Sequence, residues 1–347
     1  MQDSPTGRRT GATNKKLGVL GTLVWDTIRT PGGELELEDW GGIAYSLTAL
    51  EGTLPPEWTV VPILKVGRDL SDGALRYLDD FQCVSQLSAV TVVPEPNNRV
   101  ELLKAGDGQR TEHLTGGVPG WSWTELEPHL EGLDGLYSNF ISGFEMTLEV
   151  GQRLAGGFPA PTHADLHSLF LGIEASSGRR THRPLSDALS WVRCFDSVQM
   201  NADEFGLFCE GREQPWDWVG GLVGGAPKIL VVTLGSEGSA GIASELAMNP
   251  TCDWFASRQN ARPVPSHFEV AAPQGTAVQG DAIGCGDVWG ATFFGSFLRY
   301  GDFKASMHRA NEMAKRNLTT QGTRALLKQV RKGPPSRVTS GSEEGRT

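Results

Sequence analysis

The stretch Gly280-Asp-Ala-Ile-Gly-Cys-Gly-Asp-Val-Trp-Gly290 places two aspartates around a pair of glycines, late in a chain of 347 residues. No charged residue follows from Val288 to Leu298, and the large apolar side chains of that segment recur at helical spacing. This pattern predicts a glycine-rich turn that opens a buried helix.

The predicted turn is suited to holding an anion. The first N–H groups of a helix have no partner within the helix and lie at the positive end of its dipole, and glycine lets a ligand approach the backbone closely. Asp287 would then stand at the mouth of the site and take a proton from a hydroxyl group. These are the requirements of phosphoryl transfer to an alcohol. The alternative is a Gly-Asp turn that only begins a core helix.

The same stretch resembles the C-terminal signature of the ribokinase-like (PfkB) carbohydrate kinase family, commonly Asp-Thr-Thr-Gly-Ala-Gly-Asp. Here it reads Asp281-Ala-Ile-Gly-Cys-Gly-Asp287. The resemblance implies that Asp287 is the catalytic base and that the amides of Gly284, Cys285 and Gly286 form an anion hole.

Two departures from the signature matter. Cys285 replaces the usual alanine, which is a small change. Ala282 and Ile283 replace the two threonines, and this removes hydroxyl groups near the place where many members bind a monovalent cation such as K⁺. Asp281 stays as a candidate on the cofactor side of the site.

A metal-binding motif follows the predicted strand Asp196–Met200. Asn201-Ala-Asp-Glu204 matches the family's Asn-x-x-Glu motif. The resemblance implies that Glu204 organises Mg²⁺ through water, since Mg²⁺ keeps several waters and takes few direct protein ligands. Taken alone, the same spacing is a helix-capping box.

A nucleotide segment is expected later in the chain. Thr233-Leu-Gly235-Ser-Glu-Gly238 ends an apolar strand and resembles the family's Thr-Leu-Gly-x-x-Gly segment, whose glycines make room for ATP. A hairpin turn is the alternative. Asn311 lies in the predicted helix Phe303–Leu318, near where the family closes on adenine.

Substrate-binding candidates lie early in the chain. Asp26 follows the first predicted strand, where the family places an aspartate that accepts hydrogen bonds from substrate hydroxyls. Gly41 and Gly42 resemble the family's N-terminal Gly-Gly motif, which brings the backbone close to the substrate. Ser46 stands where the family often has asparagine. A turn aspartate and a helix-start glycine pair are the ordinary alternatives.

Two further candidates have strong alternatives. Arg99 would neutralise a phosphate already present on the substrate, or point to solvent, which we favour. Glu145 sits where the family often carries a substrate-facing acid, and it is also a normal first-turn glutamate of a helix.

The order of predicted elements gives the fold. Residues 17–24 form an apolar strand, residues 34–40 alternate like a half-exposed strand, and strand and helix signals alternate through most of the remaining chain. We predict an α/β, doubly wound, mostly parallel sheet flanked by helices, with a small β-sheet lid from about residues 17–45 and 88–118. Ligands of such sheets bind beyond the carboxyl ends of the strands.

One kinase domain is expected over residues 16–331. Residues 1–15 and 332–347 are polar and rich in glycine, serine, threonine or proline, and we expect a disordered leader and tail.

Composition narrows the partners. The formal net charge of −10 argues against nucleic acid or an anionic membrane, and no segment is apolar enough to span a bilayer. Five cysteines without CxxC spacing fit a cytoplasmic protein. The resemblance points to a homodimer through the lid.

The sequence therefore predicts ATP-dependent phosphorylation of a hydroxyl on a sugar or sugar-like molecule. A nucleoside kinase of the same family and a non-catalytic sugar- or nucleotide-binding relative are the alternatives. A different class is a metal-dependent hydrolase, because His163, Asp165 and His167 would share one face of a strand.

Overall fold

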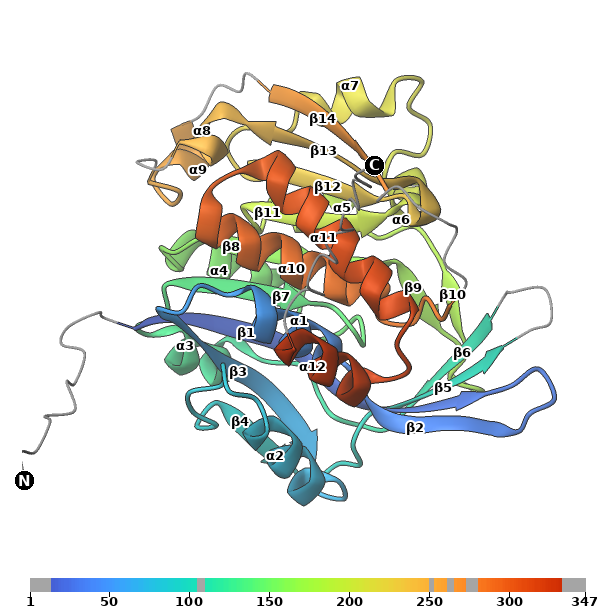
Figure 1. Ribbon diagram of the computed structural model, residues 1–347. Coiled ribbons are helices and arrows are strands. Elements are labelled where there is room, and N and C mark those ends of the chain that lie inside the picture. The colour runs from blue at the N-terminus through green and yellow to red at the C-terminus, as the bar shows by residue number, and fades with distance from the viewer. Residues whose placement is uncertain (1–13, 105–109, 250–252, 261–264, 273–279, 333–347) are drawn as a thin grey trace, which may run out of the picture.

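The computed structural model describes residues 14–104, 110–249, 253–260, 265–272 and 280–332. The predicted leader and tail fall outside these ranges, except for Asn14, Lys15 and Lys332. Within the described chain, a sheet of twelve strands runs through the molecule with helices on both of its faces (Figure 1).

The elements follow in chain order. The strands are β1 (Lys15–Arg29), β2 (Leu35–Gly42), β3 (Trp58–Gly67), β4 (Val90–Val93), β5 (Arg99–Lys104), β6 (Arg110–Thr115), β7 (Gly135–Asn139), β8 (Thr162–Asp165), β9 (Leu171–Ile173), β10 (Arg180–His182), β11 (Ser197–Asn201), β12 (Ile229–Thr233), β13 (Gly238–Ser244) and β14 (Pro265–Ala271). The helices are α1 (Ile43–Thr53), α2 (Ser71–Asp79), α3 (Trp123–Leu130), α4 (Leu148–Gly157), α5 (Ala188–Val192), α6 (Ala202–Phe208), α7 (Pro215–Gly220), α8 (Glu245–Met248), α9 (Ser257–Asn260), α10 (Cys285–Tyr300), α11 (Phe303–Leu318) and α12 (Thr323–Arg331).

The main sheet has the strand order β14-β13-β12-β11-β8-β7-β1-β3-β4. All neighbours from β12 to β4 are parallel, and β13 and β14 add an antiparallel edge. This confirms the predicted α/β architecture with a mostly parallel sheet. The crossovers place the carboxyl ends of the parallel strands along one edge, where a ligand site is expected.

Strand β1 belongs to both the main sheet and the lid. Residues 15–22 of this strand pair with β3 in the main sheet, and residues 23–29 pair with β2 and β5 of the lid. The second antiparallel pair of the lid is β5 with β6. The lid sheet is therefore narrower than the predicted ranges, since residues 17–22 and β4 belong to the main sheet. Asp26 lies within β1 rather than after it.

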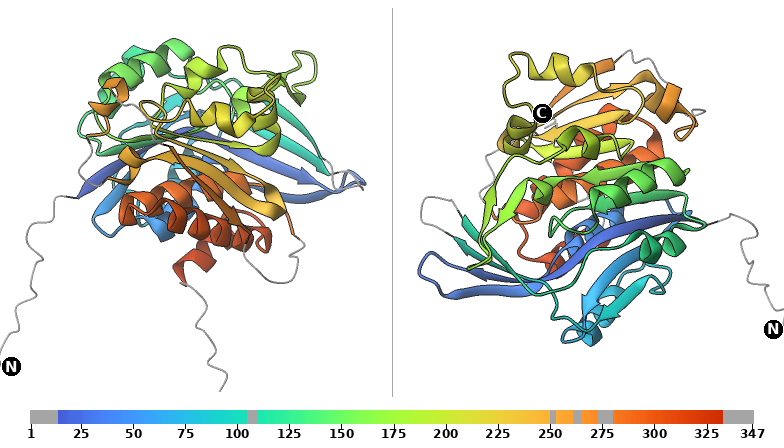
Figure 2. Two further views of the ribbon diagram at one scale, coloured as in Figure 1. Left: turned by 90° about the horizontal axis from the view of Figure 1, so that it is seen from above. Right: turned by 180° about the vertical axis from the view of Figure 1, so that it is seen from behind.

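The two faces of the sheet are covered by different parts of the chain. One core joins α1, α2, α10 and α12 to the sheet, and another joins α3 to α7. The left view of Figure 2 shows α10 and α11 on one side of the sheet and the helices from the middle of the chain on the other.

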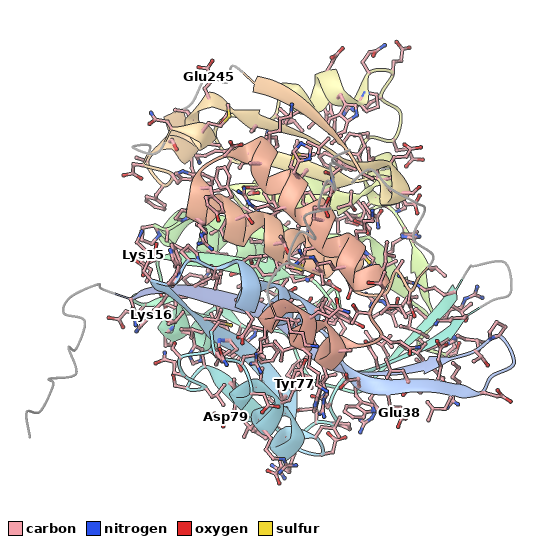
Figure 3. All side chains as sticks on the ribbon, viewed as in Figure 1. Lys15, Lys16, Glu38, Tyr77, Asp79 and Glu245 are labelled. Carbon is pink, nitrogen blue, oxygen red and sulfur yellow. The ribbon has the colours of Figure 1, made fainter. Side chains whose placement is uncertain are left out.

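Apolar and polar contacts tie the start of the chain to its end. Tyr77 of α2, labelled in Figure 3, packs against Trp40 of β2 and donates a hydrogen bond of 2.8 Å to Thr323 of α12. Among the described residues, no helix combines the length and apolarity needed to cross a bilayer.

Candidate active site

The predicted glycine-rich turn opens α10. Gly284 is the residue before the helix and has a φ of 72°, in the region that glycine adopts most readily. A Cβ at this position would lie 2.4 Å from the ring of Tyr45, so the turn rests directly on α1. Asp287 occupies the first turn of the helix.

Buried polar groups fix the position of Asp287. Asn139, the last residue of β7, donates from Nδ2 to Asp287 Oδ1 at 2.8 Å and to Ser46 Oγ at 3.1 Å. The hydroxyls of Ser46 and Tyr137 lie 3.4 and 3.5 Å from the main-chain oxygen of Asp287. Ser46 is fully buried, so its side chain supports the start of α10 and does not face a substrate.

Asp26 is held by the close approach of β2. A Cβ on Gly41 would lie 1.7 Å from Asp26 Oδ2, so only glycine leaves room for this carboxylate. Gly42 ends β2 with a φ of 59°, and α1 begins at the next residue. The Gly-Gly pair thus shapes the space around Asp26, as well as starting a helix.

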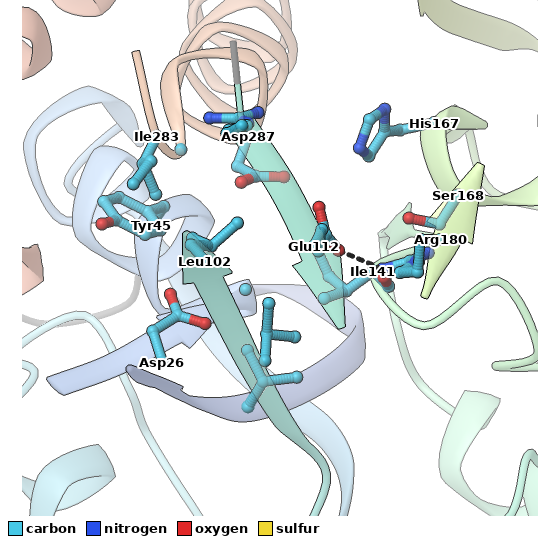
Figure 4. A pocket seen from close by; sticks show the side chains of 15 residues that line it. Asp26, Tyr45, Leu102, Glu112, Ile141, His167, Ser168, Arg180, Ile283 and Asp287 are labelled. Atoms are coloured by element: carbon cyan, nitrogen blue, oxygen red, sulfur yellow. Dashed lines mark hydrogen bonds and ion pairs between the residues drawn. The ribbon is translucent and has the colours of Figure 1, made fainter. Parts of the chain in front are cut away.

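Asp26 and Asp287 line the same cavity, together with Gly42 and Gly284. The cavity of about 80 Å³ has room for several water-sized groups, which suits part of a small polar ligand. Figure 4 shows the two aspartates, Tyr45 and Leu102 around this space, with the lid strands crossing it.

The pKa values of Asp26 and Asp287 are both raised. Burial, followed by the nearby carboxylates of Glu112 and Asp287, raises the pKa of Asp26 well above its usual range. Burial also raises the pKa of Asp287, while the amide of Asn139 acts in the opposite direction. Perturbed carboxyl groups that share a cavity are typical of functional sites.

Charged residues that no sequence motif indicated complete the cavity. Arg110 and Glu112 enter from β6 of the lid, and Arg180 enters from β10. Arg180 Nη1 lies 2.7 Å from Glu112 Oε1 and donates to the main-chain oxygen of Ile141 at 2.9 Å. Its Nε is buried and has no partner in the described part of the chain, so a ligand oxygen would satisfy it.

Besides Ser46, two further predicted substrate residues lie outside the cavity. Arg99 extends from the face of β5 opposite to Val100 and Leu102, which line the cavity, and it pairs with Asp69 at 2.7 Å. With 39% of its side chain exposed, Arg99 points toward solvent, the alternative that we favoured, and makes its ion pair there.

Glu145 is buried behind the site. Its carboxylate accepts hydrogen bonds from Thr22 Oγ1 at 2.8 Å, from the main-chain nitrogen and hydroxyl of Ser142 at 2.6 and 2.8 Å, and from the main-chain nitrogen of Gly143 at 3.0 Å. It lines a separate small pocket, not the cavity of Asp26 and Asp287. With four donors on its carboxylate, Glu145 stabilises the loop at Ser142 and Gly143.

The Asn-x-x-Glu segment forms the capping box that its spacing also predicted. Asn201 accepts from the main-chain nitrogen of Glu204 at 3.0 Å, and Glu204 accepts from that of Asn201 at 2.8 Å. The Glu204 side chain has no exposed area, and His167 Nδ1 lies 2.5 Å from Oε1. Although burial disfavours the charged ring, Glu204 raises the pKa of His167 to about 9.

The structure does not assemble the alternative metal site on the strand at residues 163–167. The ring of His163 is fully buried and stacks between Tyr137 and Phe294, with centroids at 5.4 and 5.2 Å. Burial lowers its pKa to about 3. The described residues contain no cluster of three potential metal ligands.

The predicted nucleotide segment joins β12 to β13. Thr233 ends β12, and Gly235 has a φ of 60° with nothing within 4 Å of the place where a Cβ would stand, so the turn has an open surface. Gly238 has a φ of 98°. Asn311 is buried and accepts hydrogen bonds from Trp289 at 2.7 Å and Ser239 at 3.1 Å, which ties α11 to α10 and β13.

Comparison with solved structures identifies the fold. The protein matches an Arabidopsis thaliana ribokinase complexed with ribose and ATP at a TM-score of 0.61 and 17% identity, over 92% of this chain and 99% of that one. The protein has the ribokinase fold.

Other proteins with the ribokinase fold match to a similar extent. A Burkholderia thailandensis nucleoside kinase in complex with inosine gives a TM-score of 0.64 at 15% identity, over 90% of this chain and 93% of that one. A sulfate complex of a pyrophosphate-dependent kinase in the ribokinase family also gives 0.64 at 15% identity, over 88% and 96%. No family model and no curated protein matches the sequence.

Proposed function

We propose that this protein is a kinase that transfers the terminal phosphoryl group of ATP to a hydroxyl of a sugar or nucleoside-like acceptor. One observation carries the proposal. Asp287, at the start of a glycine-opened helix, and Asp26, held in place by Gly41, line one cavity beneath the lid. The ribokinase fold supports it, because ribokinases and nucleoside kinases share this architecture.

The acceptor would bind between the two aspartates. Asp26 accepts hydrogen bonds from its hydroxyls, and the buried Nε of Arg180 donates to one of its oxygens. Asp287 takes the proton of the attacking hydroxyl, since Asn139 occupies only one of its oxygens. The lid covers the acceptor and keeps out water, which would otherwise compete for the phosphoryl group.

The amides of Gly284 and Gly286 would stabilise the charge that gathers on the migrating group. The Cys285 amide, which the sequence also suggested, already donates to the main-chain oxygen of Ala282 at 3.1 Å. The open turn at Gly235 fits a nucleotide, because no side chain fills the space above it. ATP bound there supplies the phosphoryl group.

Magnesium does not fit the site predicted at Glu204. The Glu204 carboxylate is fully buried and already accepts from Asn201 and His167, so neither an ion nor its water shell reaches it. We therefore assign no metal to Glu204, and we treat Mg²⁺ as part of the MgATP substrate.

A phosphorylation screen tests the proposal. The protein is incubated with MgATP and a panel of sugars and nucleosides, and product is measured by mass. Asp287→Asn is the matched variant, because its remaining oxygen still accepts from Asn139, and turnover should fall by at least about a hundredfold. Acceptor binding without product from the wild-type protein would favour the non-catalytic alternative.

The panel is repeated with pyrophosphate in place of ATP. A pyrophosphate-dependent kinase shares the fold, so the fold does not choose the donor. Product with pyrophosphate alone would keep the kinase and change the donor.

Self-association through the lid is a second part of the proposal. Leu35 and Leu103 are 55% and 39% exposed, and both pair with Arg29 at the tip of the lid. Light scattering on the wild type and on Leu35→Ser with Leu103→Ser tests it. A dimer that the double variant abolishes is expected, and a monomeric wild type would refute it.

A further inference from the structure

A lysine of the lid reaches the turn that opens α10. Lys104 is the last residue of β5, and its Nζ lies 2.8 Å from Asp281 Oδ2. The same nitrogen lies 2.8 and 2.9 Å from the two carboxylate oxygens of Glu36 on β2. Gln321, between α11 and α12, donates to Glu36 at 2.9 Å. The Lys104 ammonium therefore links both lid strands to the body of the protein.

Asp281 organises the turn that receives this charge. Its Oδ1 accepts from the main-chain nitrogen of Ile283 at 3.0 Å, which sets the path of the chain into Gly284. Asn317 of α11 donates to the main-chain oxygen of Ile283 at 2.8 Å. A Cβ on Gly280 would lie 1.7 Å from the Leu318 oxygen, so the segment lies tightly against the end of α11. A change at Asp281 is thereby transmitted to the proposed anion hole.

A free monovalent cation does not fit this arrangement. The Asp281 oxygen that would attract it is already paired with an ammonium at hydrogen-bond distance. Ala282 and Ile283 offer no side-chain oxygen. The side chains of Lys104 and Asp281 are 29% and 21% exposed, so solvent weakens the attraction between their charges. The contacts of Lys104 with Glu36 therefore help to hold the ammonium beside Asp281.

We propose that Lys104 is a positioning residue that supplies the positive charge at the Asp281 turn, so that phosphoryl transfer in this protein needs no K⁺. The proposal rests on the proposed kinase function. Because Lys104 belongs to the lid, the charge reaches the turn when the lid lies over the acceptor. The residue does not touch the reacting atoms, and it acts by keeping Asp281, and with it Gly284 to Gly286, in place.

The experiment compares wild type with Lys104→Met in KCl and in tetramethylammonium chloride at equal ionic strength. The wild type should turn over equally in both salts. Lys104→Met should lose about tenfold in kcat without K⁺, less than removal of a direct oxyanion donor, and recover in part when K⁺ fills the vacated place. Arg29→Met is the control, since it removes another lid ion pair, Arg29 with Glu101 at 2.6 Å, which shares no residue with the ion pairs of Lys104.

Thermal unfolding gives a readout that needs no activity. A cation that binds only the folded protein raises the melting temperature. K⁺ should raise the melting temperature of Lys104→Met above its value in tetramethylammonium, and should not do so for the wild type or Arg29→Met.

Three results would overturn the proposal: K⁺-specific activation or stabilisation of the wild type, wild-type turnover in Lys104→Met, or a loss in Lys104→Met that K⁺ does not reduce. If the wild type phosphorylates nothing, the proposed function fails, and the melting arm still decides whether Lys104 holds the place of a cation.

Discussion

The contact between Gly41 and Asp26 gives the sharpest test of the acceptor site. A Cβ added at Gly41 would stand 1.7 Å from Asp26 Oδ2 and 2.3 Å from Asp26 Cγ. Ordinary contact begins at 3.4 Å, so in Gly41→Ala the carboxylate must retreat by 3.4 − 1.7 Å, about 1.7 Å. The main chain of Gly41 cannot give way easily, because it pairs with Val24 in the β1–β2 ladder.

A displacement of this size has a predictable effect on catalysis. Misplacement of a catalytic group by about 1 Å can cost about a hundredfold in rate. We expect kcat/KM for the acceptor in Gly41→Ala to fall by about a hundredfold, which is about 2.7 kcal/mol of transition-state stabilisation. The KM for ATP should not change, because the predicted nucleotide segment lies at β12 and β13.

The assay measures initial rates with acceptor and ATP varied in turn, beside melting temperatures. Gly32→Ala is the matched control. It makes the same substitution on the lid, and the nearest atom to its new Cβ is Thr30 Oγ1 at 3.8 Å, an ordinary contact. A folded Gly41→Ala protein with the acceptor kinetics of Gly32→Ala would refute the assignment of Asp26.

Three further outcomes follow from the site. Since burial raises the pKa of Asp287, kcat should rise with pH through a midpoint above the ordinary value of 3.8, and a pH-independent kcat would contradict a base at Asp287. Arg180→Met should raise the acceptor KM by about tenfold, and Arg180→Lys should not restore it, because lysine lacks the planar guanidinium. Glu145→Gln puts an amide among the donors of Ser142 and Gly143, so it should destabilise the protein by about 1–3 kcal/mol, seen in melting, with acceptor KM unchanged.

The fold was predictable because its signals are local. The alternation of strand and helix patterns indicated the parallel sheet, and the apolar run after Asp287 indicated α10 as the structure has it. The full length of β1 was not predictable. Its second half changes neighbours from β3 to β2 and β5, and only the folded sheet shows that the strand continues past Val24.

The site was predictable only where a motif is contiguous. Asn139, Glu112 and Arg180 belong to no motif. Only the meeting of β6 and β10 brings Glu112 and Arg180 to the cavity, and only the folded sheet brings Asn139 of β7 to Asp287. Local pattern also could not tell that Ser46 and Glu145 face inward, since serine and glutamate near a helix start are equally common at a surface. Their burial is decided by the elements that pack over them.

The continuous strand β1 has a consequence for motion. At β1 no linker separates the lid from the main sheet, because Thr22 of the main sheet and Leu23 of the lid are consecutive residues of one strand. If the lid moves to admit a substrate, this continuous strand has to bend, because no hinge separates its two halves. Asp26 lies on the lid half of β1, so such a movement would carry Asp26 away from Asp287 and would bring the two acids together again when the lid returns.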